Sequence, residues 1–230
     1  MTHHSACRSC AFRAAALGLA LALVGQPLAA QRPHLSAAAR TYVRIDTAVV
    51  ALTNARVIDG TGAAARENQT VIIRDGNIAA AGAAAGIAVP AGALVIDMTG
   101  KTVIPGLVMV HEHLYYPAGP GIYGNYTESF SRLYLAGGVT SMRTGGNMNG
   151  YSELNIAKAI ERGDKAGPWI DATAPYLNGP NNFGQMQALD SPEAARKFVT
   201  FWADQGATSF KAYMQIHRDV LGAAIGAAHA

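Results

Sequence analysis

The sequence predicts an α/β fold that begins with a small antiparallel sheet and continues as the first half of a (β/α)8 barrel. Short strand-like runs separated by turn signals fill residues 48–104. From residue 105 onward, strands alternate with amphipathic helices at a spacing of roughly 30 residues, which is typical of parallel βα units. Four such units fit in the sequence, and a complete barrel of about 250 residues has eight.

Residues 1–30 have the features of a secretory signal peptide. Arg8 and Arg13 precede an apolar run over residues 14–25, and small residues follow it. The run is shorter than the roughly 20 apolar residues that a membrane span needs, and an uncleaved anchor is the alternative. We therefore expect export after cleavage near Ala30, with no membrane association beyond export.

The composition is that of an ordinary globular protein, with 50% hydrophobic and 14% charged residues. The net charge of +3 comes without a basic run, so we expect no nucleic-acid partner. Both cysteines, Cys7 and Cys10, fall in the expected signal peptide, which leaves the mature chain without a thiol. Residues 31–47 show no clear period and are predicted to be an exported linker.

Short strands and turns are predicted over residues 48–104. Residues 49–62 predict two strands separated by Thr53 and Asn54. The Asp75-Gly76 pair is the strongest hairpin signal in the chain. Residues 93–106 predict one more strand, a tight turn, and the run into the next strand.

Residues 101–114, KTVIPGLVMVHEHL, hold the first candidate site. A buried strand predicted over residues 102–110 runs directly into His-Glu-His. Alternate residues of a strand share a face, so His111 and His113 should point to one spot and Glu112 away from it. Two imidazoles fixed by one strand are half of a metal site. A lone His-X-His more often has a structural role, but the Pro-Gly start and the apolar run favour the metal site here.

The remaining βα units are predicted from apolar spacing and helix caps. Ser191 and Pro192 mark the start of one helix, and Gly206 follows its end. The predicted strands are residues 102–110, 139–143, 168–177 and 207–216, and the predicted helices are residues 127–138, 152–163, 191–206 and 218 onward. Because the last helix stops in mid-pattern at Ala230 and only four units are present, we expect a truncated chain.

Lys211 is the second candidate, in the predicted fourth strand. Strand alternation places it on one face with Ser209 and Tyr213. A lysine that points into a barrel is costly unless it is paired or chemically changed. The residues alone leave open a second arrangement, in which Lys211 lies at the end of the strand and reaches solvent.

The segment KTVIPGLVMVHEHL resembles a signature of the amidohydrolase superfamily, in its imidazolonepropionase-like and prolidase-like branch. The resemblance covers residues 49–230. It is strongest in the segment that ends in His-Glu-His and around Lys211. One departure is Met109, where the family usually has an Asp that is not a metal ligand. The resemblance implies a metal-bearing (β/α)8 barrel beside a small β-sandwich domain. Residues 48–104 would be the N-terminal part of the sandwich, and residues 105–230 the first four βα units of the barrel.

The resemblance also implies a ligand set. His111 and His113 would bind a divalent metal, with Zn²⁺ the expected ion, in a centre of one or two ions. Lys211, carboxylated by carbon dioxide, would bridge two ions. Two further histidines and the general-base Asp would come from later strands, beyond Ala230.

The implied activity is hydrolysis of a C–N bond in an amide, a cyclic amide or a dipeptide-like substrate by metal-activated water. Arg143, Tyr176 and Asn178 fall at the ends of predicted strands and are candidates for a substrate pocket, although Arg143 more often satisfies loop carbonyls in such a place. The expected partner is a small molecule or short peptide, and homo-oligomers are compatible with the sequence. The alternative is a truncated, catalytically incompetent half-barrel that only binds metal.

Overall fold

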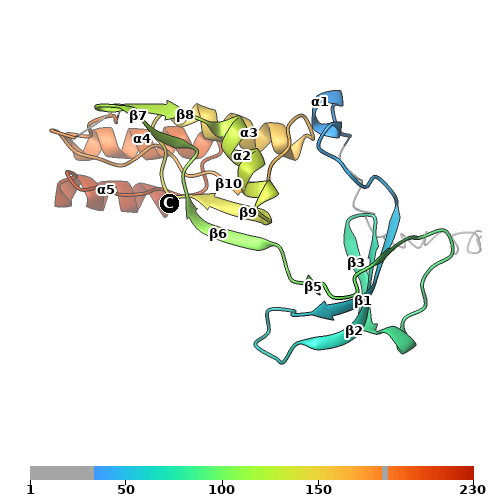
Figure 1. Cartoon of the computed structure of the whole chain (residues 1–230). Helices are drawn as coiled ribbons and strands as arrows, with labels where there is room; N and C mark the ends of the chain where they lie inside the picture. The colour runs from blue at the N-terminus through green and yellow to red at the C-terminus, as the bar shows by residue number, and fades with distance from the viewer. Residues whose placement is uncertain (1–33, 183–185) are drawn as a thin grey trace, which may run out of the picture.

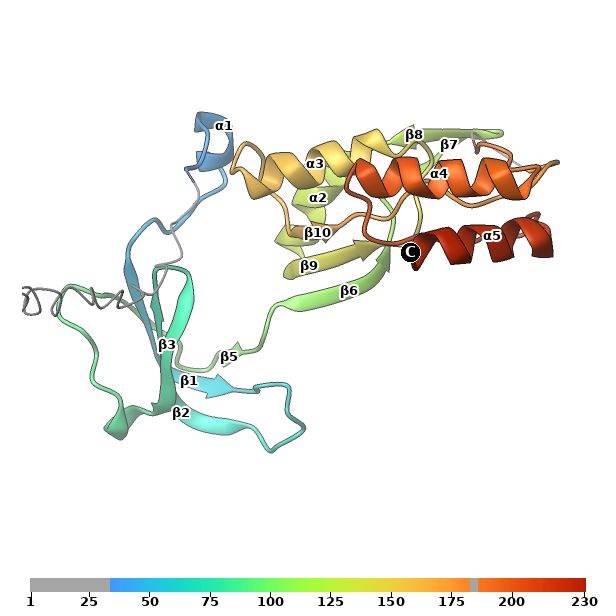
Figure 2. The same ribbon diagram turned by 180° about the vertical axis from the view of Figure 1, so that it is seen from behind.

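The computed structural model describes residues 34–182 and 186–230. The expected signal peptide lies outside this range, so export stays a prediction. Two parts are visible in Figures 1 and 2: a sheet formed early in the chain, and a second sheet covered on one side by helices. Within the described ranges, no helix is both long enough and apolar enough to cross a membrane.

The first sheet has five strands, with the order β3-β2-β1-β4 and with β5 also paired to β1. The β2–β3 hairpin predicted at Asp75 and Gly76 is confirmed. These two residues have φ values of 48° and 80°, the positive values that a two-residue type I′ turn requires. The strands are β1 (Val49–Val57), β2 (Arg66–Arg74), β3 (Asn77–Ala83), β4 (Leu94–Asp97) and β5 (Thr102–Val103), and a 3-10 turn η1 (Ala84–Gly86) follows β3.

Two details of this sheet differ from the prediction. First, β1 is one strand and not two. Asn54 takes a φ of 56° and the register with β2 shifts beside it, but β1 pairs with β2 on both sides of this point. The polar pair therefore makes an irregularity within the strand instead of a turn. Second, the sheet is mixed and not purely antiparallel, since β4 and β5 both run parallel to β1.

Residues 34–47, which were predicted as linker, include the short helix α1 (Ala37–Arg40). The backbone N–H of Ser36 donates to the carbonyl of Gly163 at 3.0 Å, and the Ser36 hydroxyl donates to the carbonyl of Asp164 at 2.9 Å. These bonds hold the segment against the end of helix α3 (Tyr151–Glu161), as Figure 1 shows.

The second sheet is parallel and has the order β10-β9-β6. Its strands alternate with helices along the chain, as the sequence predicts, and an antiparallel hairpin is inserted after β6. The strands are β6 (Leu107–Glu112), β9 (Val139–Thr144) and β10 (Trp169–Asp171), the hairpin is β7 (Tyr115–Gly119) with β8 (Ile122–Asn125), and the other helices are α2 (Thr127–Ala136), α4 (Pro192–Asp204) and α5 (Arg218–Ala228).

The main hydrophobic core lies between this sheet and its helices, which cover one face of it (Figure 2). Met142 on β9 is 1% exposed, and Val199 on α4 is fully buried. Helix α4 begins as predicted, because the Ser191 hydroxyl accepts a hydrogen bond from the Ala194 backbone and Pro192 takes the first helical position. The part of the chain from β6 to α5 is therefore a mixed α/β layer structure.

The strand predicted over residues 102–110 is broken and is not buried. Its first residues form β5 in the first sheet, and β6 begins in the second sheet after Pro105 and Gly106. A side chain at Gly106 would overlap Thr140, so the chain crosses between sheets at a point where only glycine fits. Val108 and Val110 are 67% and 72% exposed, because they lie on the face of β6 opposite the helices.

The strand predicted over residues 207–216 is irregular. The Lys211 carbonyl accepts a hydrogen bond from Leu177 at 2.9 Å, and the Tyr213 backbone N–H donates to the Leu177 carbonyl at 2.8 Å. A single parallel bridge, between Leu177 and Ala212, is formed. The neighbouring predicted strand, residues 168–177, is regular only in β10, and beyond it the Asn147 side-chain amide donates to the Thr173 carbonyl. Even so, the segment around Lys211 runs alongside the continuation of β10.

Candidate metal centre

A bulge in β6 directs the two histidines to one face of the sheet. Met109 pairs with Met142 and Glu112 with Thr144, so β6 has one residue more than β9 between these pairs. Glu112 points toward helix α2, where the Tyr134 hydroxyl donates to its carboxylate at 2.6 Å. The imidazoles on either side of Glu112 lie together on the opposite face.

The rings of His111 and His113 are 5.1 Å apart between centroids and nearly perpendicular. His111 is exposed and His113 is partly buried. Burial holds the pKa of His113 below its usual value, and the backbone of Gly146 offsets part of this effect. The neutral imidazole that this favours is the form that binds a metal. The Nδ1 atom of His113 is buried and has no hydrogen-bond partner among the described residues.

Lys211 lies at the histidine pair. Its Nζ atom is 3.2 Å from the Nε2 atom of His111 and 5.5 Å from the centre of the Tyr176 ring. Burial lowers the pKa of Lys211, and the charge of Arg143 lowers it further. The structure therefore brings together all three residues that the sequence proposes as metal ligands.

The loop after β9 forms a wall against this group. The Gly145 backbone N–H donates to the Glu112 carbonyl at 2.8 Å. A Cβ atom at Gly145 would overlap the His111 ring, and one at Gly146 would overlap the Tyr176 ring. No role was predicted for these glycines from the sequence, although two consecutive glycines shortly after a predicted strand are a signal of close backbone approach.

The three residues predicted for a substrate pocket have different surroundings. Tyr176 is 3% exposed, and its hydroxyl lies 2.5 Å from that of Tyr115. Asn178 is fully buried, and its side-chain oxygen accepts a hydrogen bond from the Gln215 backbone at 2.9 Å. Arg143 donates to the Ser209 hydroxyl at 2.9 Å. The centre of the Tyr176 ring lies 5.5 Å from the Lys211 Nζ atom, and the charge of Arg143 also acts on Lys211.

A buried acid lies on α3 near the ends of β6 and β9. Glu153 is 1% exposed, and burial raises its pKa to about 8. The Thr144 hydroxyl and the Leu114 backbone are near enough to act in the opposite direction. Glu153 was not predicted from the sequence as a residue of the site. The available signal was its position four residues before Ala157 and seven before Ile160, on the apolar side of the helix.

These donors fit a divalent metal ion. Two imidazoles, one with an unpartnered buried nitrogen, are common ligands of Zn²⁺ and similar ions. Over the described ranges, no group of three or more His, Cys, Asp or Glu side chains could hold an ion. The candidate donor set therefore consists of the histidine pair and Lys211.

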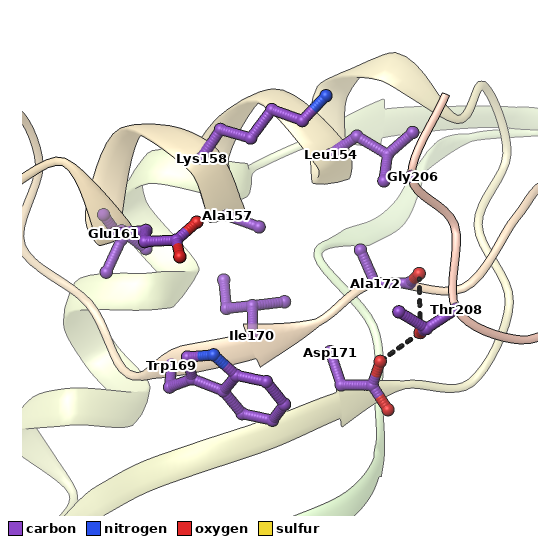
Figure 3. A pocket seen from close by; sticks show the side chains of 11 residues that line it. Leu154, Ala157, Lys158, Glu161, Trp169, Ile170, Asp171, Ala172, Gly206 and Thr208 are labelled. Atoms are coloured by element: carbon purple, nitrogen blue, oxygen red, sulfur yellow. Dashed lines mark hydrogen bonds between the residues drawn. The ribbon is translucent and has the colours of Figure 1, made fainter. Parts of the chain in front are cut away.

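A separate pocket of about 520 Å³ lies between α3 and β10, as Figure 3 shows. Its walls include Leu154, Lys158 and Ile170. Asp171 and Thr208 also line it, and the Thr208 hydroxyl donates a hydrogen bond to the Asp171 carboxylate. Neither of the two histidines nor Lys211 lines it. The residues that line it come from α3, β10 and the segment around Gly206 and Thr208, so it is not part of the candidate metal centre.

Solved structures similar to this chain include prolidase-type and related hydrolases. The chain superimposes on a protein from Bifidobacterium longum assigned as a prolidase, with a TM-score of 0.66 and 27% identity over 79% of this chain and 47% of that one. A Xaa-Pro dipeptidase with bound methionine gives a TM-score of 0.62 at 18% identity, over 79% and 54%. Molinate hydrolase gives 0.64 at 19% identity, over 80% and 52%.

Among curated sequences, a dihydroorotase from Pelobacter propionicus is 38% identical over 90 residues, which are 39% of this chain and 20% of that protein. No family model matches the chain. The chain spans about half the length of the solved structures it matches. Its structural neighbours are prolidase and amidohydrolase-superfamily proteins, in agreement with the resemblance found in the sequence.

Proposed function

We propose that this chain carries part of the active site of a metal-dependent hydrolase that cleaves C–N bonds. The observation that carries the proposal is the convergence of His111, His113 and Lys211. The hydrolase activities named for the structural neighbours support the same reaction class.

In this proposal the chain's own residues hold and orient the metal centre. His111 and His113 would hold the ion through neutral imidazole nitrogens. Lys211 would become a ligand after its neutral amine attacks carbon dioxide: an N–C bond forms, one carbon–oxygen π pair moves onto oxygen, one proton passes from nitrogen to solvent, and the product is a carbamate with two oxygen donors. Gly145 and Gly146 let the loop after β9 come close enough to fix the rings. A bound divalent ion, with Zn²⁺ proposed, would supply a water of lowered pKa and polarise the substrate carbonyl.

The proposed substrates are amides, cyclic amides and dipeptide-like molecules. Tyr213 is partly exposed beside Lys211 and offers an aromatic surface to such a substrate. The buried Tyr176 ring supports it, with the two ring centroids 4.9 Å apart. The proposal also includes export of the protein after removal of residues 1–30, which the intact mass of the native protein would test.

The first test is metal content and turnover of the purified protein. We expect the protein purified at its native length to retain Zn²⁺ or Co²⁺ after gel filtration and to hydrolyse p-nitroanilides or dipeptides, and residues 1–230 alone to be inactive. His111→Ala combined with His113→Ala should remove the metal. Unchanged metal content in this double variant would refute the proposed site.

A second candidate function is metal binding without turnover. It is favoured by the donor set, because the described residues bring no Asp or Glu into a group of three with the histidine pair. Wild type that binds metal through the histidines but shows no hydrolysis under any of these conditions would select this second function.

A further inference from the structure

Two tyrosine hydroxyls meet in the interior beside the candidate metal centre. Tyr115 is the first residue of β7 and is 8% exposed, and Tyr176 lies in the continuation of β10 and is 3% exposed. Their oxygen atoms are 2.5 Å apart, so one hydroxyl donates a short hydrogen bond to the other. Because both groups are buried, removal of one hydroxyl would take a partner away from a buried polar group, which is costly.

Each tyrosine of this pair also contacts one of the proposed metal ligands. The Tyr115 ring lies 4.8 Å from the His113 ring, measured between centroids. The Nζ atom of Lys211 lies 5.5 Å from the centre of the Tyr176 ring. The four side chains therefore form a continuous series of contacts from His113 to Lys211, with the hydroxyl bond in the middle.

Backbone hydrogen bonds hold both ends of this series. On the lysine side, the backbone N–H of Leu177 donates to the Lys211 carbonyl at 2.9 Å. On the histidine side, the backbone N–H of Tyr126 donates to the Leu114 carbonyl at 2.8 Å. Each bond involves the residue next to one tyrosine of the pair, so the hydroxyl bond links two local backbone arrangements.

The packing around the pair leaves the rings little room to move. Met148 is 7% exposed and belongs to the same buried cluster as Tyr115 and Tyr176. A Cβ atom at Gly146 would overlap the Tyr176 ring. Burial raises the pKa of both phenols, so both hydroxyls stay protonated and the pair stays a neutral hydrogen bond.

We propose that the Tyr115–Tyr176 hydroxyl pair is a positioning contact, which holds the segment of His113 at a fixed distance from the segment of Lys211. Neither tyrosine belongs to the donor set, and each acts through the ligand that its ring contacts. The metal-binding consequence rests on the proposed function, whereas the coupling of the two segments does not. Residues that orient metal ligands typically change metal affinity by about 10- to 100-fold when replaced.

The test uses the protein at its native length and replaces tyrosine by phenylalanine, which keeps each ring and removes only the hydroxyl. The variants are Tyr115→Phe, Tyr176→Phe and the two combined. Val199→Ala, a change in the buried core on α4, is the control for loss of stability alone. Two quantities are measured: hydrogen exchange of the Leu177 and Tyr126 amides in metal-free protein, and Co²⁺ affinity from its absorption spectrum.

We expect Tyr115→Phe to speed exchange at Leu177, and Tyr176→Phe to speed exchange at Tyr126, each by about tenfold. Each change then acts across the hydroxyl bond on the opposite segment. Both single variants should also weaken Co²⁺ binding by about tenfold or more. The combined variant should be affected no more than the more affected single variant, because both changes remove the same bond.

The control decides whether these effects are specific. If Tyr115→Phe speeds exchange at Leu177 no more than Val199→Ala does, or if the two single effects add in the combined variant, the coupling is refuted. Coupling with unchanged Co²⁺ affinity would refute the positioning of the metal ligands. If wild type fails to bind Co²⁺, the proposed function fails, and the exchange measurement still decides whether the hydroxyl pair couples the two segments.

Discussion

The Nζ atom of Lys211 lies 3.2 Å from the Nε2 atom of His111, although 100 positions separate the two residues in the sequence. A protonated lysine at this distance competes with a cation for the same imidazole nitrogen. A carbamate in the same place would attract a metal ion, since it is an anionic oxygen ligand. The contact therefore links the chemical state of Lys211 to the metal content of the site.

The first prediction concerns this link. Lys211→Met keeps an apolar stem but removes the amine, so no carbamate can form. We expect added bicarbonate to raise the Zn²⁺ content of wild type and to leave that of Lys211→Met unchanged, as measured by elemental analysis after gel filtration. Replacement of the exposed Lys197, which pairs with Glu193 on the surface of α4, by methionine is the matched control and should keep the bicarbonate response. An equal response in Lys211→Met would rule out the carbamate.

The second prediction concerns the wall beside His111. Gly145→Ala adds a Cβ that overlaps the ring, so either the loop or the imidazole must move. We expect Co²⁺ affinity to fall by about tenfold or more, because ligand geometry is disturbed. Gly86→Ala is the control, since a Cβ there meets nothing within 4 Å. Equal affinity in the two variants would show that the loop gives way without cost to the site.

The third prediction is a pH dependence of stability that comes from Glu153. Its pKa rises from a usual 4.5 to about 8 on folding, so the folded state binds the proton more tightly than the unfolded state. Stability from this group is therefore complete below about pH 4.5 and is lost as the pH rises toward 8, by up to about 5 kcal/mol. The titratable groups that face it are Tyr115 and Tyr176, whose pKa values are raised by burial and which stay neutral over this range.

Glu153→Gln should flatten this slope in denaturant unfolding measured from pH 5 to 8. Glu161→Gln, at the exposed end of the same helix, is the control variant and should keep the slope. A slope that persists in Glu153→Gln would assign the pH dependence to other groups.

Much of the fold could be predicted from local signals. The helix that begins at Ser191 is set by its cap, and the Asp75-Gly76 hairpin by its turn residues, so both are found where the sequence places them. Strand boundaries were less predictable, because Asn54 bends β1 without ending it and Pro105-Gly106 divides one apolar run between two sheets. At Asn54 tertiary pairing overrides the local turn signal. At Pro105-Gly106 the local signal does end the strand, and the apolar run that follows pairs with a different sheet.

The candidate site could be predicted where it depends on strand alternation. His111 and His113 lie together because Glu112 between them faces α2. The approach of Lys211 to His111 came from the resemblance to a family, since no local signal links positions so far apart. Glu153 was not found, because an acid on the apolar side of a helix acquires its meaning only from the two strand ends that surround it.

The fourth prediction tests the bond that keeps Glu112 away from the metal centre. The Tyr134 hydroxyl donates to the Glu112 carboxylate at 2.6 Å, and both side chains are partly buried. Tyr134→Phe removes the donor and leaves the carboxylate short of a partner, which should lower the free energy of unfolding by about 2 kcal/mol in urea titration. Tyr116→Phe is the matched control, because Tyr116 is 63% exposed and should change stability by less than about 0.5 kcal/mol. Since Glu112 lies between the two histidines, loss of its anchor should also weaken Co²⁺ binding, and a stability loss with unchanged affinity would show that the bulge alone orients the rings.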